Sequence, residues 1–105
     1  MDNPDLKITE NISEEGCHIY AKGRVDSNTA DILLEKLEDA LQNGQKAIVL
    51  NMSQVDYLSS IGIRVILKIF KQATENGGTF FIDRPSKIVR NVLGMVALNE
   101  MLITN

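Results

Sequence analysis

Apolar and polar residues alternate along the first part of the chain. From Leu6 to Ile12 the side chains of Leu6 and Ile8 share one face, and the alternation resumes from Cys17 to Arg24 after a polar turn at 13–16. Alternation with a period of two is typical of a strand with one buried face. The pattern therefore predicts two strands that pair as a hairpin.

The spacing of apolar residues then changes to that of a helix. Several potential helix-capping residues occupy positions 26–29, and Asn43-Gly44 is a stop signal. The apolar residues between them are Ala30, Leu33, Leu34, Leu37, Ala40 and Leu41. They form one stripe of an amphipathic helix from Thr29 to Gln42.

A short apolar run at 47–50 predicts a central strand that is covered on both faces. The elements expected after it are a loop through Asp56, a helix from about Ser60 to Asn76, a strand at 79–82, a helix from Lys87 to about Leu93 and a strand at 101–104. The order is then β-β-α-β-α-β-α-(β). Strands separated by helices predict an α/β fold, with a mixed sheet of four to five strands and helices packed on it.

The predicted helix at 60–76 carries more apolar surface than one packed face requires. One stripe, of the width expected for core packing, consists of Ile63, Ile66, Leu67, Phe70 and Ala73. A second stripe beside it consists of Ile61, Val65 and Ile69. Two interpretations stay open. Either a neighbouring helix covers the second stripe, or part of it, such as Ile61 and Val65, is exposed and docks a partner.

Ser60 lies at or next to the N-cap of this helix, where a serine hydroxyl accepts a hydrogen bond from a free backbone N–H. Capping alone would explain the residue. A phosphate on Ser60 would also be stabilised by the helix dipole and the free N–H groups, and Arg64, one turn further on, could pair with it. Because the charge would lie beside Ile61 and Val65, it would weaken the docking of a partner there.

Composition sets the class of protein. The 105 residues are 44% apolar and 24% charged, which predicts one globular domain over residues 1–105. The formal net charge is −3, and nucleic-acid binding needs a concentrated basic face, so nucleic acid is not an expected partner. The chain shows neither a signal-peptide layout nor an apolar run of membrane-spanning length. We therefore expect a cytoplasmic protein without membrane insertion.

Little in the sequence favours catalysis, a cofactor or a metal. Cys17 is the only cysteine, and no Cys/His spacing of a metal site occurs. Ser60 lacks the first glycine of the G-x-S-x-G motif, and His18 is the only histidine. Gly77-Gly78 lacks the lysine and the following helix of a phosphate loop. We therefore expect neither an enzyme nor a bound cofactor or metal.

Four segments together resemble one protein family. They are Gly23 to Ala30, similar to G-x-[LIV]-D-x-x-[TN]-[AV]; Ala47 to Asn51, similar to a central strand that ends in Asn; Asp56 to Leu67, similar to an apolar-x-S-x-G-apolar element; and Val89 to Leu98, similar to a closing helix. The four occur in order over essentially the whole chain. The sequence resembles the STAS domain, and within it the stand-alone anti-sigma factor antagonists.

That resemblance implies a partner-switching cycle in bacterial transcription. In the family the unmodified protein binds an anti-sigma factor, which is itself a serine kinase, and so releases a sigma factor. The kinase phosphorylates the serine two residues before a glycine, which matches Ser60 before Gly62, and a phosphoserine phosphatase removes the phosphate. The resemblance also implies a monomer. The residues expected on the partner-facing surface are Asp26, Asn51, Ser59, Ile61, Gly62, Arg64 and Val65.

Two positions differ from the family pattern. Ser59 stands where an acid usually precedes the acceptor, which makes it a second candidate phosphoacceptor, and Ala97-Leu98 stands where Gly-Leu is common. A competing interpretation is a STAS module that docks constitutively, for example as an accessory subunit of a lipid-transport ABC system or a scaffold component. Ser60 would then serve only as a helix cap.

Overall fold

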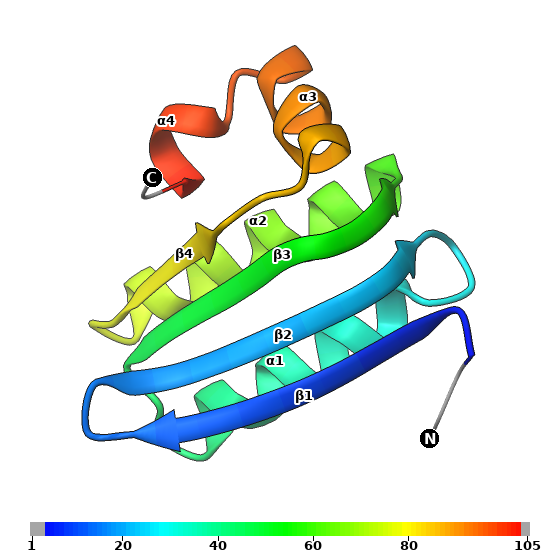
Figure 1. The fold of residues 1–105 in the computed structure, drawn as a ribbon. Helices are drawn as coiled ribbons and strands as arrows, with labels where there is room; N and C mark the ends of the chain where they lie inside the picture. Colours follow the sequence, from blue (N-terminus) through cyan, green and yellow to red (C-terminus); the bar gives the residue numbers. More distant parts are fainter. Residues whose placement is uncertain (1–3, 104–105) are drawn as a thin grey trace.

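The computed structural model describes residues 4–103, which contain one mixed sheet of four strands (Figure 1). The strands are β1 (Leu6–Ser13), β2 (Gly16–Val25), β3 (Ala47–Leu58) and β4 (Thr79–Asp83). They lie in the order β1-β2-β3-β4, with β1 antiparallel to β2 and the other neighbours parallel. The predicted hairpin pair and mixed α/β sheet are confirmed.

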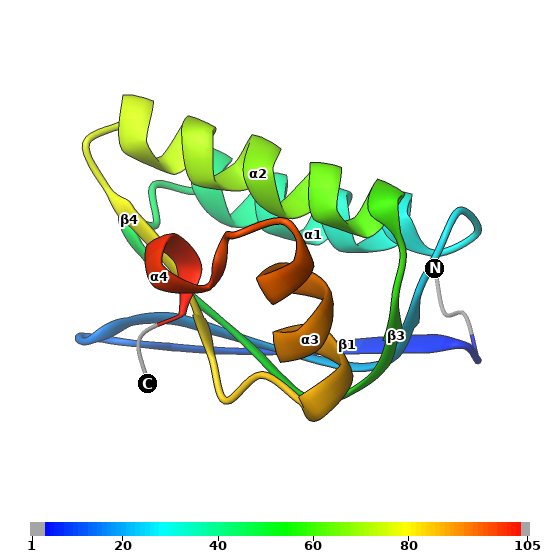
Figure 2. The ribbon, with the colours of Figure 1, turned by 90° about the horizontal axis from the view of Figure 1, so that it is seen from above.

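The helices lie mainly on one side of this sheet. Those in the described residues are α1 (Ala30–Gln42), α2 (Ser60–Glu75), α3 (Lys87–Met95) and α4 (Asn99–Leu102). Figure 2 shows α1 and α2 side by side over one face, with α3 and α4 toward the β4 edge. Among the described helices, none covers the opposite face of β1 and β2.

The core lies between the sheet and α1 and α2, because the inward side chains of each strand are apolar. Fully buried side chains of the sheet include Ile19, Ile48, Leu50, Met52, Phe80 and Ile82. Leu33 and Leu37 of α1 meet them and are 0% exposed, as the helical spacing predicted. Each such side chain contributes about 1.5–3 kcal/mol on burial, so this face determines how the strands and helices are placed.

The helix α2 buries a different stripe from the one that its apolar spacing suggested. Its buried residues are Gly62, Val65, Ile66, Ile69 and Ala73. Val65 is 6% exposed and Ile69 is 0% exposed, so for these two residues the interpretation that a neighbouring helix covers the second stripe is confirmed, and the alternative that Val65 is exposed is wrong. Leu67 is 37% exposed, so its expected burial in the first stripe is also wrong. The reason is that α2 contacts α1 as well as β4, and its buried arc is centred between the two stripes. Ile61 remains exposed, at 41%.

The strand β3 is longer than predicted. Asp56, expected in a loop, lies within a strand that continues to Leu58. Met52, Val55 and Leu58 are buried at every third position, which conceals the two-residue period of a strand. Two register shifts in the β2–β3 ladder absorb the additional β3 residues as bulges. The loop prediction failed because a bulge depends on the neighbouring strand.

The predicted last strand is also wrong. Residues 99–102 form α4, Ile103 makes an isolated parallel bridge to Ile82, and Thr104 lies outside the described residues. Leu102 is fully buried, so a single helical turn places its side chain in the core. Just before α4, Ala97 has a φ of 59°, a left-handed conformation that favours glycine. This conformation gives a physical reason for the glycine that the family pattern has there.

Candidate functional site

Two neighbouring strand ends bring the first candidate residues together. Val25 and Leu58 end β2 and β3 as partners in the ladder, and the Ser59 N–H donates to the Val25 carbonyl at 2.9 Å. The loop at 26–29 therefore lies beside the start of α2 (Figure 1). Functional sites of α/β folds commonly lie at the carboxyl ends of parallel strands. The residues gathered here, termed the serine site, are Asp26, Ser59, Ser60, Ile61 and Arg64.

The structure separates the roles of the two serines. Ser59 is the N-cap of α2, and its Oγ accepts a hydrogen bond from the Gly62 N–H at 3.3 Å. Ser60 is the first residue of α2; its side chain is exposed, and its hydroxyl has no hydrogen-bond partner among residues 4–103. Ser60 thus lies next to the cap, one of the two positions expected. The Ser59 hydroxyl is used by the helix, whereas the Ser60 hydroxyl is open to solvent.

We expect Ser59→Ala to lower the free energy of unfolding by about 1 kcal/mol, because the Gly62 N–H loses its acceptor. Ser60→Ala is the matched control. It removes a hydroxyl that caps nothing, so it should change the free energy by less than about 0.5 kcal/mol. Urea denaturation of both variants measures the difference. Equal losses would contradict the division of roles between the two serines.

Negative charge is stabilised at the start of α2. The first N–H groups of a helix have no acceptor within it, and the positive end of the helix dipole lies there. Arg64 is one turn further on, exposed, and without an ion pair in the described part of the chain. At i+4 from Ser60, its guanidinium is in reach of a phosphate on that serine. The position therefore suits a phosphorylated side chain.

Asp26 is held in place by its own loop. Its Oδ1 accepts from the Asn28 N–H at 2.9 Å, and its Oδ2 accepts from the Arg24 Nε at 3.2 Å. The bond from Asn28 is the largest cause that holds the pKa of Asp26 below its ordinary value of 3.8, and the bond from Arg24 adds to it. A lowered pKa stabilises the fold above pH 3.8, and this contribution is lost as the pH falls through the lowered value. At neutral pH, Asp26 is a fixed negative charge at the serine site.

Thr29 stabilises the loop at 26–29 from its buried side. It is 0% exposed; its hydroxyl donates to the Arg24 carbonyl at 2.7 Å and accepts from the Asp26 N–H at 3.0 Å. We expect Thr29→Val, which keeps the shape, to lower the free energy of unfolding by roughly 2 kcal/mol, because both backbone groups lose their partner.

Thr74→Val is the control for this prediction. The exposed Thr74 hydroxyl donates to the Phe70 carbonyl at 2.9 Å, and water can replace it there. This control should therefore cost less than about 0.5 kcal/mol. Thermal and urea unfolding compare the two variants. A loss from Thr29→Val as small as that from Thr74→Val would mean that the loop does not depend on the buried hydroxyl.

Fewer of the residues predicted to face a partner are exposed than the sequence suggested. Ile61 offers an exposed side chain, whereas Gly62 and Val65 are buried. A Cβ on Gly62 would lie 2.6 Å from Leu58 Cδ1 and 2.7 Å from Val25 Cγ1. Gly62 therefore lets α2 approach the ends of β2 and β3, and its part in the site is to permit this close packing.

Asn51 does not lie at the serine site. It is seven residues before the end of β3, which places it about 20 Å away along the strand. Its Oδ1 accepts from the N–H and the hydroxyl of Ser53, at 2.9 and 2.8 Å. The expectation that Asn51 shares a surface with Asp26 is corrected accordingly.

The sequence analysis missed one pair beside the site. The Arg24 guanidinium lies over the ring of Tyr57, 4.4 Å from its centroid, while it also pairs with Asp26. Arg24 and Tyr57 are partners in the β2–β3 ladder. Cation–π contacts of this kind depend on the register of two strands, so a local sequence pattern does not predict them. The contact with Tyr57 holds the Arg24 side chain, which in turn pairs with Asp26.

Within residues 4–103, the structure gives little support for a reactive thiol, a metal site or a membrane-spanning helix. Burial, and then Glu10, raise the pKa of the Cys17 thiol to about 11, so the thiol stays protonated and unreactive at neutral pH. Among the described residues, no group of three or more His, Cys, Asp or Glu side chains could hold a metal ion. None of the helices within this part of the chain is long and apolar enough to cross a membrane.

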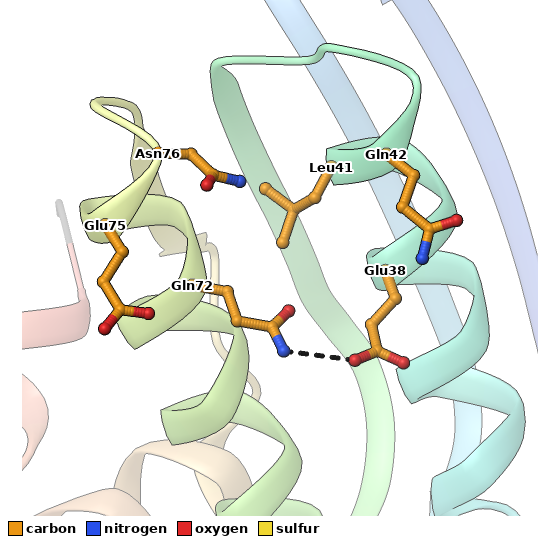
Figure 3. A pocket seen from close by; sticks show the side chains of 6 residues that line it. All are labelled: Glu38, Leu41, Gln42, Gln72, Glu75 and Asn76. Carbon is orange, nitrogen blue, oxygen red and sulfur yellow. Dashed lines mark hydrogen bonds between the residues drawn. The ribbon is translucent and has the colours of Figure 1, made fainter.

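A cavity of about 280 Å³ lies between the C-terminal ends of α1 and α2 (Figure 3). Its lining is mostly polar: Glu38, Leu41, Gln42, Gln72, Glu75 and Asn76. Gln72 Nε2 donates to Glu38 Oε2 at 3.2 Å, and Glu38 also pairs with Lys68. The cavity lies at the far end of α2 from Ser60, about 20 Å away at the rise of a helix. It therefore contributes nothing to the serine site.

The STAS domain family matches residues 3–105 of the sequence. The chain belongs to this family. BtrV of Bordetella bronchiseptica, whose name describes it as an anti-sigma factor antagonist, is 32% identical over 71 residues, which are 68% of this chain and 61% of that protein. The match thus spans less than two thirds of that relative. The anti-sigma F factor antagonist of Paenibacillus polymyxa is 27% identical over 85 residues, 80% of this chain and 73% of that one.

Solved structures share the fold. An anti-sigma factor antagonist from Mycobacterium paratuberculosis superposes with a TM-score of 0.84 at 16% identity, over 97% of this chain and 87% of that one. SpoIIAA in its unphosphorylated form gives 0.79 at 19% identity, over 92% and 86%. The phosphorylated form of the same Bacillus protein gives 0.73 at 18% identity, over 92% and 89%. At such identities the likeness establishes the STAS fold.

Proposed function

We propose that the chain is an anti-sigma factor antagonist that binds an anti-sigma factor at the serine site and is switched off by phosphorylation of Ser60. The observation that carries the proposal is the different use of two adjacent hydroxyls. Ser59 caps α2, and Ser60 presents an exposed hydroxyl at a helix end that stabilises anions. Two relatives named as antagonists, and the existence of SpoIIAA in both phosphorylation states, support it.

Ser59, the residue before the proposed acceptor, is compatible with Ser60 as the phosphoacceptor. The family usually has an acid there, and Asp and Ser are about equally good N-caps. Ser59 therefore keeps the start of α2, through its bond to the Gly62 N–H. Because this hydroxyl is engaged, Ser60 is the better of the two candidate acceptors.

In the unphosphorylated state, Ile61 would supply the apolar contact and Arg64 and Asp26 the charged rim of the interface. An exposed branched side chain surrounded by polar groups is a common arrangement in protein interfaces. Binding of the anti-sigma factor releases the sigma factor. The chain acts in the cytoplasm as a binding protein and a monomer, and it catalyses no reaction of its own.

Phosphorylation would change the charge of this surface and leave the fold in place. The kinase transfers the γ-phosphoryl group of ATP to Ser60 Oγ: an O–P bond forms, the bond to ADP breaks, and the hydroxyl proton passes to the base of the kinase. The helix end and Arg64 then stabilise the dianion. A partner would have to desolvate that charge beside Ile61, so binding weakens. Hydrolysis by a phosphatase returns the hydroxyl.

Phosphosite mapping tests the proposal. The chain is incubated with ATP and its cognate kinase-type anti-sigma factor, and the product is analysed by mass spectrometry. We expect one phosphate on Ser60 in the wild type and in Ser59→Ala, and none in Ser60→Ala. A phosphate on Ser59 or elsewhere, or no phosphate at all, would contradict the switch.

A further inference from the structure

The face of the sheet that no described helix covers contains a groove. It lies over β1, β2 and β3 and has a volume of about 450 Å³, within the range of small-molecule sites. Its lining is Lys7, Thr9, Tyr20, Ala21, Lys22, Asn51, Ser53 and Gln54. The serine site does not use this face, so a ligand in the groove would bind independently of the proposed function.

Two lysines lie side by side in the lining of this groove. Lys7 and Lys22 are directly opposite partners in the β1–β2 ladder, where side chains on one face start about 5 Å apart. Like charges so placed are destabilising, and neither ammonium has an ion pair within residues 4–103. No acid lines the groove, although the whole chain carries a formal charge of −3. A local excess of positive charge on an acidic protein attracts anions.

A β3 bulge lies within the lining of the groove. The ladder passes from Tyr20↔Asn51 to Lys22↔Gln54, so β3 has one more residue than β2 at this point. Bulges bend a strand and re-aim its side chains, and they are frequent beside binding sites. In this bulge Asn51 Oδ1 accepts two hydrogen bonds from Ser53, and the amide nitrogen of Asn51 has no partner among the described residues. The amide N–H donors of Asn51 are thus available at the groove.

The acids beside the groove are not part of its lining. Asp83 is the ladder partner of Asn51 and contacts Arg84 at 4.0 Å, outside the groove lining. On the other side Asp26 is paired with Arg24. The polar groups that a ligand would contact in this lining are therefore two ammonium groups, the side-chain amides of Asn51 and Gln54, and the hydroxyls of Thr9, Tyr20 and Ser53.

We infer that this groove binds a small organic phosphate. Ammonium groups and amide N–H donors converge on an oxyanion, and lysine binds phosphate as a point charge. The volume is larger than a bare phosphate ion requires, and the half-exposed ring of Tyr20 offers a surface for an organic moiety. A phosphate monoester with a flat organic group would contact the ammonium groups through its phosphate and the Tyr20 ring through its organic group.

Titration of the ¹⁵N-labelled chain with phenyl phosphate, inorganic phosphate and succinate tests the inference. We expect phenyl phosphate to shift the amide signals of Lys7, Lys22, Asn51 and Ser53, with an affinity at least about tenfold above the other two probes. The variant Lys7→Gln/Lys22→Gln should weaken that affinity at least about tenfold. Since the substitution relieves a like-charge pair, its melting temperature should not fall, so lost binding would not reflect unfolding.

The matched control is Lys71→Gln/Lys87→Gln, which removes the same charge from exposed positions on α2 and α3. It should bind phenyl phosphate as the wild type does. Equal weakening by both double variants would show general charge attraction and overturn the inference. Shifts confined to the start of α2, equal affinity for succinate, or binding to phosphatidylglycerol vesicles without binding of phenyl phosphate would overturn it as well.

Discussion

Ser60→Asp is expected to weaken the binding of the anti-sigma factor by about thirtyfold, or roughly 2 kcal/mol. The new carboxylate lies beside the exposed Ile61, and a docked partner must remove its water. The free chain should respond in the opposite way. An acid in the first turn interacts favourably with the helix dipole, so the free energy of unfolding should rise by about 0.3–1 kcal/mol. Isothermal titration calorimetry and urea denaturation measure the two effects.

Two controls separate charge from shape and from position. Ser60→Asn has nearly the shape of the aspartate without its charge, and it should bind within about threefold of the wild type. Ser13→Asp adds the same charge at the last residue of β1, at the other end of the sheet from the serine site (Figure 1). It should leave the affinity unchanged.

The outcomes distinguish the two interpretations of the serine site. If Ser60→Asp binds as tightly as the wild type, the charge switch is wrong and the surface docks its partner constitutively. If Ser60→Asn weakens binding as much as Ser60→Asp, the interface senses the size of the side chain. Loss of stability in Ser60→Asp would show that the helix end does not stabilise an anion.

Gly62→Val is expected to lower the free energy of unfolding by roughly 3 kcal/mol. The added Cβ alone would lie 2.6 Å from Leu58 Cδ1 and 2.7 Å from Val25 Cγ1, and Val25 is 0% exposed on a central strand. Leu58 can turn its terminal methyl groups aside, but the short branched side chain of Val25 cannot yield without moving β2. A β-branched residue also gains little of the helix propensity that replacing glycine by alanine brings.

Gly94→Val is the control for this prediction. Gly94 is an exposed glycine of α3, and a Cβ there would meet the side-chain amide of Asn99 at 3.1 Å. A movable amide can yield by a few tenths of an ångström, so the loss should stay below about 1 kcal/mol. Urea denaturation compares the two variants. Similar losses would mean that the close approach of α2 to β2 and β3 is not what requires Gly62.

Some features of the molecule follow from local pattern and were predicted correctly. The alternation in β1 and β2 and the helical spacing of Leu33 and Leu37 set the element types, because periods of two and 3.6 residues place side chains on one face. The position of Ser60 beside a helix start also follows from neighbouring residues. The family assignment rested on short motifs in the right order, and it too is confirmed.

Other features depend on which segments meet, and the predictions failed or stayed open there. Whether Val65 is buried depends on how α2 is rotated against α1 and the sheet. The extent of β3 depends on bulges opposite β2, and α4 replaces the expected last strand because its one turn buries Leu102. The distance between Asn51 and the serine site follows from the length of β3.

The sequence by itself determined the order and type of most elements, the family, and the short segment in which the serine site lies. Only the tertiary structure decided that Ser59 caps α2 while Ser60 is open, that Gly62 is there for close packing, and that Lys7 and Lys22 lie side by side. The physical reason is the range of the interactions. Periodicity acts between neighbouring residues, whereas strand register, helix rotation and side-chain packing are set by contacts between segments distant in the chain.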